Sequence, residues 1–154
     1  KEIRKLITDI KDRIKISEEL LGKNPKVEVA EADGIKIFIF DSKPLIVSHG
    51  RFLIPTLIFE EGLKFLPKII VDMGAVPHVC NGADVMAPGI VKLEGEFRKE
   101  DLVAVLDEKN RRVIAVGLAL KNSRDIAEAK RGKVVKNLHY VGDKLWRIIK
   151  SLSQ

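Results

Sequence analysis

Several residue types are scarce in this chain of 154 residues, and each shortage narrows what the protein can be. Cys80 is the single cysteine, so an intramolecular disulfide is impossible, which favours a reducing compartment. No apolar run approaches the roughly 20 residues that a membrane-spanning helix needs, and the N-terminus lacks a signal-peptide pattern. We therefore predict a cytoplasmic protein with no membrane contact. Glutamine occurs once while Lys, Arg, Glu and Ile abound, a bias typical of proteins from hot environments.

Signatures of catalysis and of cofactor binding are also missing. His49, His78 and His139 lie far apart, and no Cys-x-x-Cys, His-Glu-x-x-His or acidic calcium loop accompanies them. A metal site assembled in space is the alternative. Neither glycine-rich nucleotide fingerprint occurs, and the carboxylates lie mostly in mixed-sign runs such as EGEFRKED. Cys80 stands among small apolar residues, as a core cysteine does. These patterns predict no enzyme, no metal and no cofactor.

What is present is a large apolar fraction with an excess of basic residues. Apolar residues make up 45% of the chain and charged residues 32%, which is typical of a folded globular protein. The net charge of the chain is +6. Residues 1–68 contain 13 basic and 11 acidic residues, a net +2, and residues 69–154 contain 15 basic and 11 acidic residues, a net +4. This excess favours a polyanionic partner bound by the second half. A merely solvated basic surface is the alternative.

The first 67 residues predict a small helix–sheet–helix domain. Apolar residues from Ile3 to Ile14 recur at helical spacing, and Gly22 and Pro25 supply stop signals. Pro55 suits the first turn of a second helix that ends before Pro67. Between the helices we predict three short strands, at Val27–Glu31, Ile35–Phe40 and Leu45–Ser48.

Residues 68–154 predict a mostly β, barrel-like domain with short helices, which makes the chain α+β overall. A short helix should run from Ser123 toward Gly132, and Asp143 should cap a final helix. Short, β-branched strands are predicted at Lys68–Asp72, Leu102–Asp107, Arg112–Lys121 and Lys133–Val141.

The stretch VDMGAVPHVCNGADVMAPGI, from Val71 to Ile90, is almost bare of charge. Its glycines at 74, 82 and 89 remove side chains where another chain or a ligand comes close. Gly74 stands at a predicted strand-to-helix junction, where free N–H groups accept phosphate or base edges. Pro88 belongs at a bend or edge, and exposed Met86 and Ala87 would offer an unpaired nucleotide an apolar platform. The alternative is that these glycines only let strands cross tightly in a small barrel.

Four stretches together resemble a PUA domain, the RNA-binding module named for pseudouridine synthases and archaeosine transglycosylases. They are VDMGAVPHVCNGADVMAPGIV, FRKEDLVAVLD, RVIAVGLALKNS and KRGKVVKNLHYVGDKLW, and the resemblance covers about residues 69–150. The layout ahead of this module, with PTL at Pro55–Leu57, resembles the malignant T-cell-amplified sequence family of translation factors, which has archaeal counterparts.

The resemblance implies a pseudobarrel that binds RNA along the helix at Gly74–Gly82, the strand at Asp84–Gly89 and the last strand near Lys133–Lys136. Unpaired bases would meet backbone and small side chains there, and lysines would hold phosphates. Trp146, on the apolar stripe of the last helix, is better explained by core packing. The predicted RNA-binding residues are Gly74, Ala75, His78, Gly82, Ala83, Val85, Met86, Ala87, Pro88, Gly89, Lys92, Lys130, Arg131, Lys133 and Lys136.

The resulting hypothesis is a non-catalytic RNA-binding protein of the translation machinery. It would hold a tRNA acceptor end or ribosomal RNA at the small ribosomal subunit, and the family implies an initiation-factor-like protein partner. One alternative is an accessory RNA-binding subunit of an RNA-modification system of the pseudouridine or archaeosine type. Another is a protein-interaction scaffold whose RNA affinity is weak and lost as salt rises.

Overall fold

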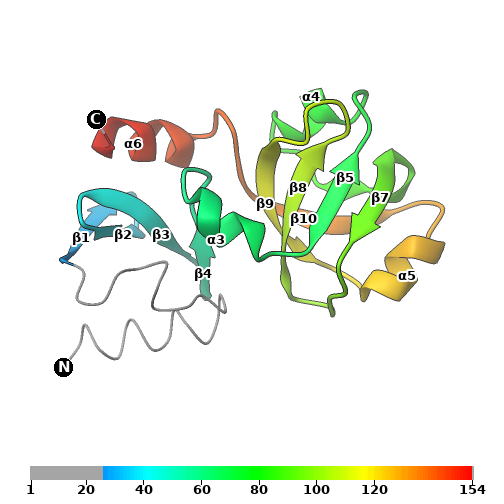
Figure 1. Ribbon diagram of the computed structural model, residues 1–154, viewed down its shortest axis with the longest axis horizontal. Helices are drawn as coiled ribbons and strands as arrows, with labels where there is room; N and C mark the ends of the chain where they lie inside the picture. The colour runs from blue at the N-terminus through cyan, green and yellow to red at the C-terminus, as the bar shows by residue number, and fades with distance from the viewer. Residues whose placement is uncertain (1–25, 154) are drawn as a thin grey trace. The chain divides into compact units, whose positions relative to one another are not determined.

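The computed structural model describes residues 26–153 and confirms an α+β protein (Figure 1). These residues form two compact units, one of residues 26–65 with 148–153 and one of residues 66–147. Residues 148–153 therefore group with the first unit, whereas the sequence analysis placed them in the second domain. The helix predicted ahead of Gly22 lies outside the described residues. Within 26–153, no helix is both long and apolar enough to cross a membrane.

The first unit is a four-stranded antiparallel sheet in chain order. Asp33 and Gly34 form the turn between its first two strands with φ of 53° and 80°, the left-handed conformation that a two-residue hairpin requires. Asp41 and Ser42 make the next turn in the same way, with φ of 47° and 72°. The strands are β1 (Val27–Ala32), β2 (Ile35–Phe40), β3 (Lys43–His49) and β4 (Phe52–Pro55).

The helix predicted from Pro55 is wrong over its first half. Phe52–Pro55 pairs with β3 as strand β4, and the helix α3 is confined to Glu60–Lys64. Thr56 is fully buried, and its hydroxyl donates to the Pro44 carbonyl at 2.8 Å, which ties the end of β4 to β3. Proline was compatible with a first helical turn, but a proline can also end an edge strand. The core of this unit contains Phe38, Phe40, Leu45, Ile46 and Phe59.

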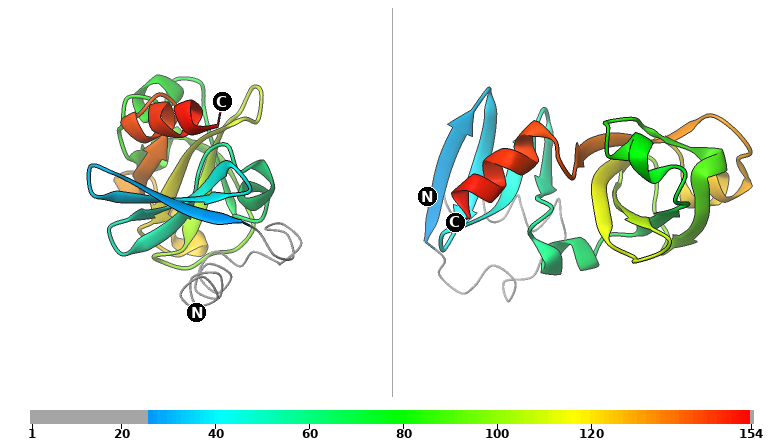
Figure 2. Two further views of the ribbon diagram at one scale, coloured as in Figure 1. Left: turned by 90° about the vertical axis from the view of Figure 1, so that its left-hand side faces the viewer. Right: turned by 90° about the horizontal axis from the view of Figure 1, so that it is seen from above.

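The second unit is a six-stranded sheet in the order β6-β10-β9-β8-β5-β7, and it curls into a barrel (Figure 2). Only β5 and β8 pair in parallel; the other neighbours are antiparallel. Its elements are β5 (Lys68–Val71), α4 (Val76–Val79), β6 (Val85–Met86), the 3₁₀ helix η1 (Ala87–Gly89), β7 (Ile90–Glu94), β8 (Leu102–Asp107), β9 (Val113–Ala119), α5 (Ser123–Glu128), β10 (Lys133–Tyr140) and α6 (Lys144–Leu152), which continues into the first unit.

The strands predicted at Lys68–Asp72, Leu102–Asp107, Arg112–Lys121 and Lys133–Val141 are confirmed to within two residues. The strand predicted at Asp84–Gly89 is only in part correct, because β6 ends at Met86 and Ala87–Gly89 form η1, and β7 was not predicted. The barrel interior is aliphatic, and β8 and β9 are buried along almost their whole length, as their β-branched sequences require. Gly117 on β9 faces β10 so closely that a Cβ atom would lie 2.4 Å from Val135 Cγ1 and 2.9 Å from the Lys136 carbonyl oxygen. The absence of a side chain at Gly117 therefore allows the barrel to close.

Asp143 joins the end of β10 to the start of α6. Its Oδ1 accepts the Trp146 N–H at 2.6 Å, which confirms the predicted helix cap. Its Oδ2 accepts the Tyr140 N–H and lies 2.9 Å from Nδ1 of His139, which is fully buried. Burial alone raises the pKa of Asp143, but the hydrogen bond and charge of His139 and the two backbone N–H groups outweigh it, so this pKa is lowered.

Replacing Gly117 with alanine should destabilise the protein by about 1–3 kcal/mol, because the added methyl group has no room. This is the reverse of the usual effect of Gly→Ala within a strand. Gly74→Ala is the control, since its Cβ would meet only Asp72 Oδ1, at 3.3 Å, a contact that a shift of a few tenths of an ångström relieves. Urea unfolding measures both; an equal cost at the two positions would contradict the close approach of β9 and β10.

The lowered pKa of Asp143 predicts an acid-sensitive contribution to stability. The ionised carboxylate is favoured in the folded state, so its stabilisation is complete above the unfolded-state pKa and is lost as pH falls through the folded-state pKa. Asp143→Asn should lower the free energy of unfolding at pH 7 by about 1–2 kcal/mol and flatten its decline in acid. Urea unfolding from pH 7 to pH 3 measures this, with Asp125→Asn on the exposed face of α5 as control. If the free energy of unfolding falls with pH equally steeply in Asp143→Asn and in the unmodified chain, Asp143 does not cause the acid sensitivity.

Candidate RNA-binding pocket

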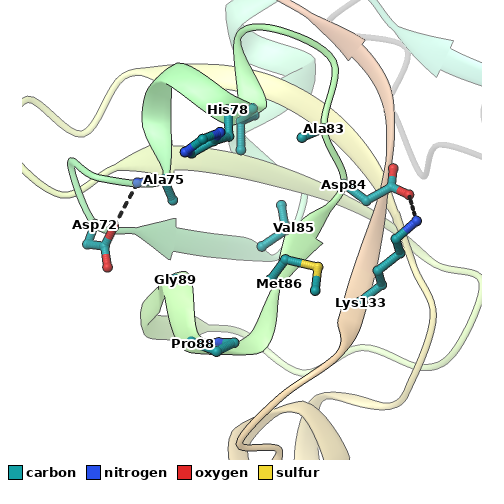
Figure 3. Close-up of a pocket in the computed structure, with 11 residues that line it drawn as sticks. Asp72, Ala75, His78, Ala83, Asp84, Val85, Met86, Pro88, Gly89 and Lys133 are labelled. Carbon is teal, nitrogen blue, oxygen red and sulfur yellow. Dashed lines mark hydrogen bonds and ion pairs between the residues drawn. The ribbon is translucent and has the colours of Figure 1, made fainter.

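A pocket of about 590 Å³ opens on the second unit beside α4, β6 and η1 (Figure 3). In the close-up, His78 lies on α4 at one side of the pocket, and Met86 and Pro88 lie at the other side. Asp72 lies at one end, and Asp84 and Lys133 lie at the opposite end. The lining residues are Asp72, Ala75, His78, Val79, Ala83, Asp84, Val85, Met86, Pro88, Gly89 and Lys133.

Asp72 fixes the first wall of this pocket. Directly after β5, its Oδ1 accepts the Ala75 N–H at 2.8 Å, and its own N–H donates to the Gly89 carbonyl at 2.9 Å. The start of α4 is thereby tied to the end of η1. The two segments approach so closely that a Cβ atom on Gly89 would lie 3.1 Å from the Ala75 Cβ. A side chain at Gly89 would therefore push the two segments apart by a few tenths of an ångström.

Asn137 on β10 fixes the opposite wall. Its side-chain Nδ2 donates to the carbonyls of Val79 and Ala83, both at 3.0 Å, and its backbone N–H donates to Asp84 Oδ1 at 2.8 Å. The loop from Val79 to Asp84 is thus held against β10 at the irregularity in register after Asn137. Gly82, at the middle of this loop, has φ of +95°, which favours glycine.

The polar groups of the pocket carry charges of both signs. Lys133 pairs in register with Met86, and its ammonium lies 3.7 Å from Asp84 Oδ2. His78 is exposed on α4, and Asp72 and Asp84 are partly buried. The remaining lining is apolar or backbone. Such a site can enclose a flat apolar group and hydrogen-bond to its edges.

Eight of the predicted residues line the pocket: Ala75, His78, Ala83, Val85, Met86, Pro88, Gly89 and Lys133. Gly74, Gly82, Lys92, Lys130, Arg131 and Lys136 lie outside its lining, and all six are exposed. Among these cations, Lys92 lies 3.5 Å from Glu94 on β7. The individually predicted residues omitted Asp72, Val79 and Asp84, although all three lie between Val71 and Ile90 and the last two fall within the predicted RNA-binding segments.

The predicted apolar platform is half wrong. Met86 is 46% exposed, but Ala87 is only 7% exposed and belongs to the barrel core. The chain turns into η1 at this point, and the Ala87 N–H donates to the Gly132 carbonyl at 2.9 Å. Val85 is 2% exposed, so it closes the floor of the pocket.

Cys80 is a partly buried residue that packs against the barrel core. Burial, and then the nearby charge of Asp107, raise the pKa of its thiol. A raised pKa disfavours the thiolate that nucleophilic chemistry needs. Over residues 26–153, no group of three or more His, Cys, Asp or Glu side chains is placed to hold a metal ion.

The PUA domain model matches residues 67–141, which include the curled sheet and every residue that lines this pocket. A second family model, a domain of unknown function (DUF1947), matches residues 1–59. The chain is 40% identical to an uncharacterized protein of Methanocaldococcus jannaschii over 149 residues, which are 95% of this chain and 91% of that protein. It is 28% identical to Translation machinery-associated protein 20 of Eremothecium gossypii over 150 residues, 92% of this chain and 83% of that one.

The chain therefore belongs to the family of PUA proteins with an N-terminal DUF1947 region that includes Translation machinery-associated protein 20, as the sequence resemblance predicted. A hypothetical protein of the hyperthermophilic archaeon Pyrococcus horikoshii shares the fold with a TM-score of 0.81 and 35% identity, over 96% of this chain and 94% of that one. A PUA domain of Aeropyrum pernix, solved with tartrate, shares the fold with a TM-score of 0.84 and 29% identity, over 99% of this chain and 89% of that one. These relatives support the archaeal and thermophilic character predicted above.

About half of the chain is also similar to part of a protein named as an enzyme. A probable tRNA pseudouridine synthase B of Pyrobaculum aerophilum is 43% identical over 86 residues, which are 56% of this chain but 25% of that protein. The similarity therefore covers about half of this chain and leaves most of the synthase unmatched.

Asn137→Ala should destabilise the chain by about 2 kcal/mol, because two carbonyls of the Val79–Asp84 loop lose their donor. Urea unfolding measures the change. Asn81→Ala, on the same loop but exposed, is the matched control and should cost no more than about 0.5 kcal/mol. Equal effects would show that the loop is held by other contacts.

Proposed function

We propose that this chain is a non-catalytic RNA-binding protein of the translation machinery. The pocket would hold an unpaired RNA end, either a tRNA acceptor end or ribosomal RNA at the small ribosomal subunit. The observation that carries this proposal is a pocket of about 590 Å³, walled by backbone and small apolar side chains, in the PUA domain of a family with translation-machinery-associated members.

The chemistry of the pocket suits a nucleotide. Its volume lies within the range of roughly 300–1,000 Å³ that small-ligand sites occupy. Exposed Met86 and Pro88 offer an apolar surface on which a base can lie, and His78 lies at the other side of the pocket. Lys133 at the edge, with exposed Lys130, Arg131 and Lys136 along the same part of the chain, can hold phosphates.

The first unit would serve a different partner. In this proposal residues 1–67 would dock a ribosomal protein or an initiation-factor-like protein. Relatives named Translation machinery-associated protein 20 match along both parts of the chain, which supports a joint role of the two parts in translation.

A second candidate is an accessory RNA-binding subunit of an RNA-modification system. The similarity of about half of the chain to part of a probable tRNA pseudouridine synthase B favours it. Purification of the tagged chain from its own cells separates the two ideas. Recovery with small ribosomal subunits supports the translation role, whereas recovery with a modification enzyme supports the alternative.

The direct test is a titration with one tRNA, intact and with its 3′-CCA removed, followed by fluorescence anisotropy at low and near-physiological salt. Intact tRNA should bind at least about tenfold more tightly at the higher salt, because general phosphate attraction is screened while pocket contacts persist. Equal binding of both tRNAs that vanishes with salt would leave only nonspecific electrostatics and would contradict the proposal.

A pair of methionine variants locates the contact. Met86→Asp places a carboxylate on the exposed wall of the pocket and should weaken binding about tenfold or more. Met73→Asp makes the same change at a methionine that is 42% exposed but outside the pocket lining, and it should bind almost as the unmodified chain does. An equal loss of RNA affinity in the two variants would show that the RNA does not contact the pocket wall at Met86.

A further inference from the structure

We propose that the pocket admits the uncharged part of a terminal nucleotide and repels a terminal phosphate, so that the chain selects RNA with a free 3′-hydroxyl. This inference rests on the proposed function, because it assumes that an RNA end enters the pocket. It adds a rule of selection that the two pocket carboxylates impose.

The first observation is the sign of the charge inside the pocket. Asp72 and Asp84 both line it, and Lys133 is the one lysine or arginine among the described lining residues. The Lys133 ammonium lies 3.7 Å from Asp84, so its attraction for an anion inside the pocket is partly offset, although its exposed side can still meet a phosphate outside. Although the chain carries +6 overall, the pocket has two carboxylates against one ammonium.

The second observation is that both carboxylates are held in place. Asp72 Oδ1 accepts the Ala75 N–H at 2.8 Å, and Asp84 Oδ1 accepts the Asn137 N–H at 2.8 Å. They lie at opposite ends of the pocket, so a ligand that fills it lies between them (Figure 3). Anchored in this way, neither carboxylate can turn far from an incoming anion.

Ionised carboxylates only accept hydrogen bonds, so they select the groups that a ligand presents. The exocyclic amino groups of bases and the 2′- and 3′-hydroxyls of ribose are donors, and they match. A terminal phosphate is an acceptor that carries up to two negative charges, and it would be repelled in a partly enclosed site.

The cations lie where they can contact the phosphates of the nucleotides that precede the terminal one. Lys130 and Arg131 are exposed directly before Gly132, whose carbonyl accepts the Ala87 N–H next to the pocket. Lys136 is exposed further along β10. This arrangement separates the positive surface that holds the strand from the negative pocket that receives its end.

The test compares three forms of one short single-stranded RNA ending in CCA: with a 3′-hydroxyl, with a 3′-phosphate, and with a 3′-hydroxyl plus a 5′-phosphate. Affinities are measured by anisotropy at pH 8, above the range in which histidine ordinarily titrates, and at near-physiological salt. The 3′-phosphate should weaken binding about tenfold or more, whereas the 5′-phosphate, which adds the same charge at the other end, should not.

Variants assign the effect to the carboxylates. Asp84→Asn and Asp72→Asn keep an oxygen that can accept the anchoring N–H, so the wall should stay in place. The double variant should bind the 3′-phosphate form about as well as the 3′-hydroxyl form. Glu108→Gln, an exposed carboxylate outside the pocket lining, is the control and should keep the full discrimination.

The outcomes distinguish this inference from the proposed function. If the chain binds none of the three RNAs, the proposed function fails and the inference falls with it. If all three bind equally well and binding still depends on Met86, the proposed function stands and the selection rule is overturned. Discrimination that survives in the double variant also overturns it, because the two carboxylates would not be its cause.

Discussion

Three hydrogen bonds from Asn137 hold the loop from Val79 to Asp84 against β10, and the pocket depends on this attachment. Two of them satisfy loop carbonyls, and the third positions the carboxylate of Asp84. The opposite wall depends in the same way on Asp72, which ties α4 to η1. Both walls are thus fixed by polar groups that the barrel supplies, before any ligand is present. Such preorganisation lowers the entropy that binding must overcome.

The near absence of charge between Val71 and Ile90 follows from this construction. Gly89 lets η1 approach α4, and Gly82 adopts a left-handed conformation within the loop. Val85 and Ala87 face the barrel core, so their side chains serve packing. Backbone and small side chains remain at the surface, with Met86 as the large exposed apolar group on the pocket wall. The two explanations of the glycines are therefore compatible, because the same close packing that shapes the barrel also shapes the pocket.

Much of this architecture could be predicted from local sequence pattern. Strands β8 and β9 are aliphatic and rich in valine and isoleucine, β10 begins with two valines, and the cap formed by Asp143 has a local signature, so these elements were found. The errors arose where local pattern is ambiguous. Pro55 fits either a first helical turn or the end of a strand, and only the pairing of β4 with β3 decides. The burial of Ala87 continues the alternation of β6, in which Val85 is buried and Met86 is exposed, so the error lay in assigning Met86 and Ala87 to one exposed surface.

The pocket was predicted only in part, for a related reason. Contacts such as that between Asn137 and Asp84 join residues far apart in sequence, and no spacing rule reveals them. The basic composition indicates an anionic partner, and lysines were therefore predicted as its contacts. The carboxylates of Asp72 and Asp84 did not fit that expectation and were left out. Several of those lysines lie outside the pocket lining, where they can contribute to attraction without shaping the site.

The central claim is that an RNA end occupies the pocket, and the two methionines of the chain allow one direct measurement. With ¹³C-labelled methionine methyl groups, Met73 and Met86 give one signal each, assigned by Met73→Leu. The two side chains are similarly exposed, at 42% and 46%, but only Met86 lines the pocket. On titration with a single-stranded RNA ending in CCA, the Met86 signal should shift and saturate while the Met73 signal stays in place. Saturable binding that leaves the Met86 signal unchanged would contradict the account.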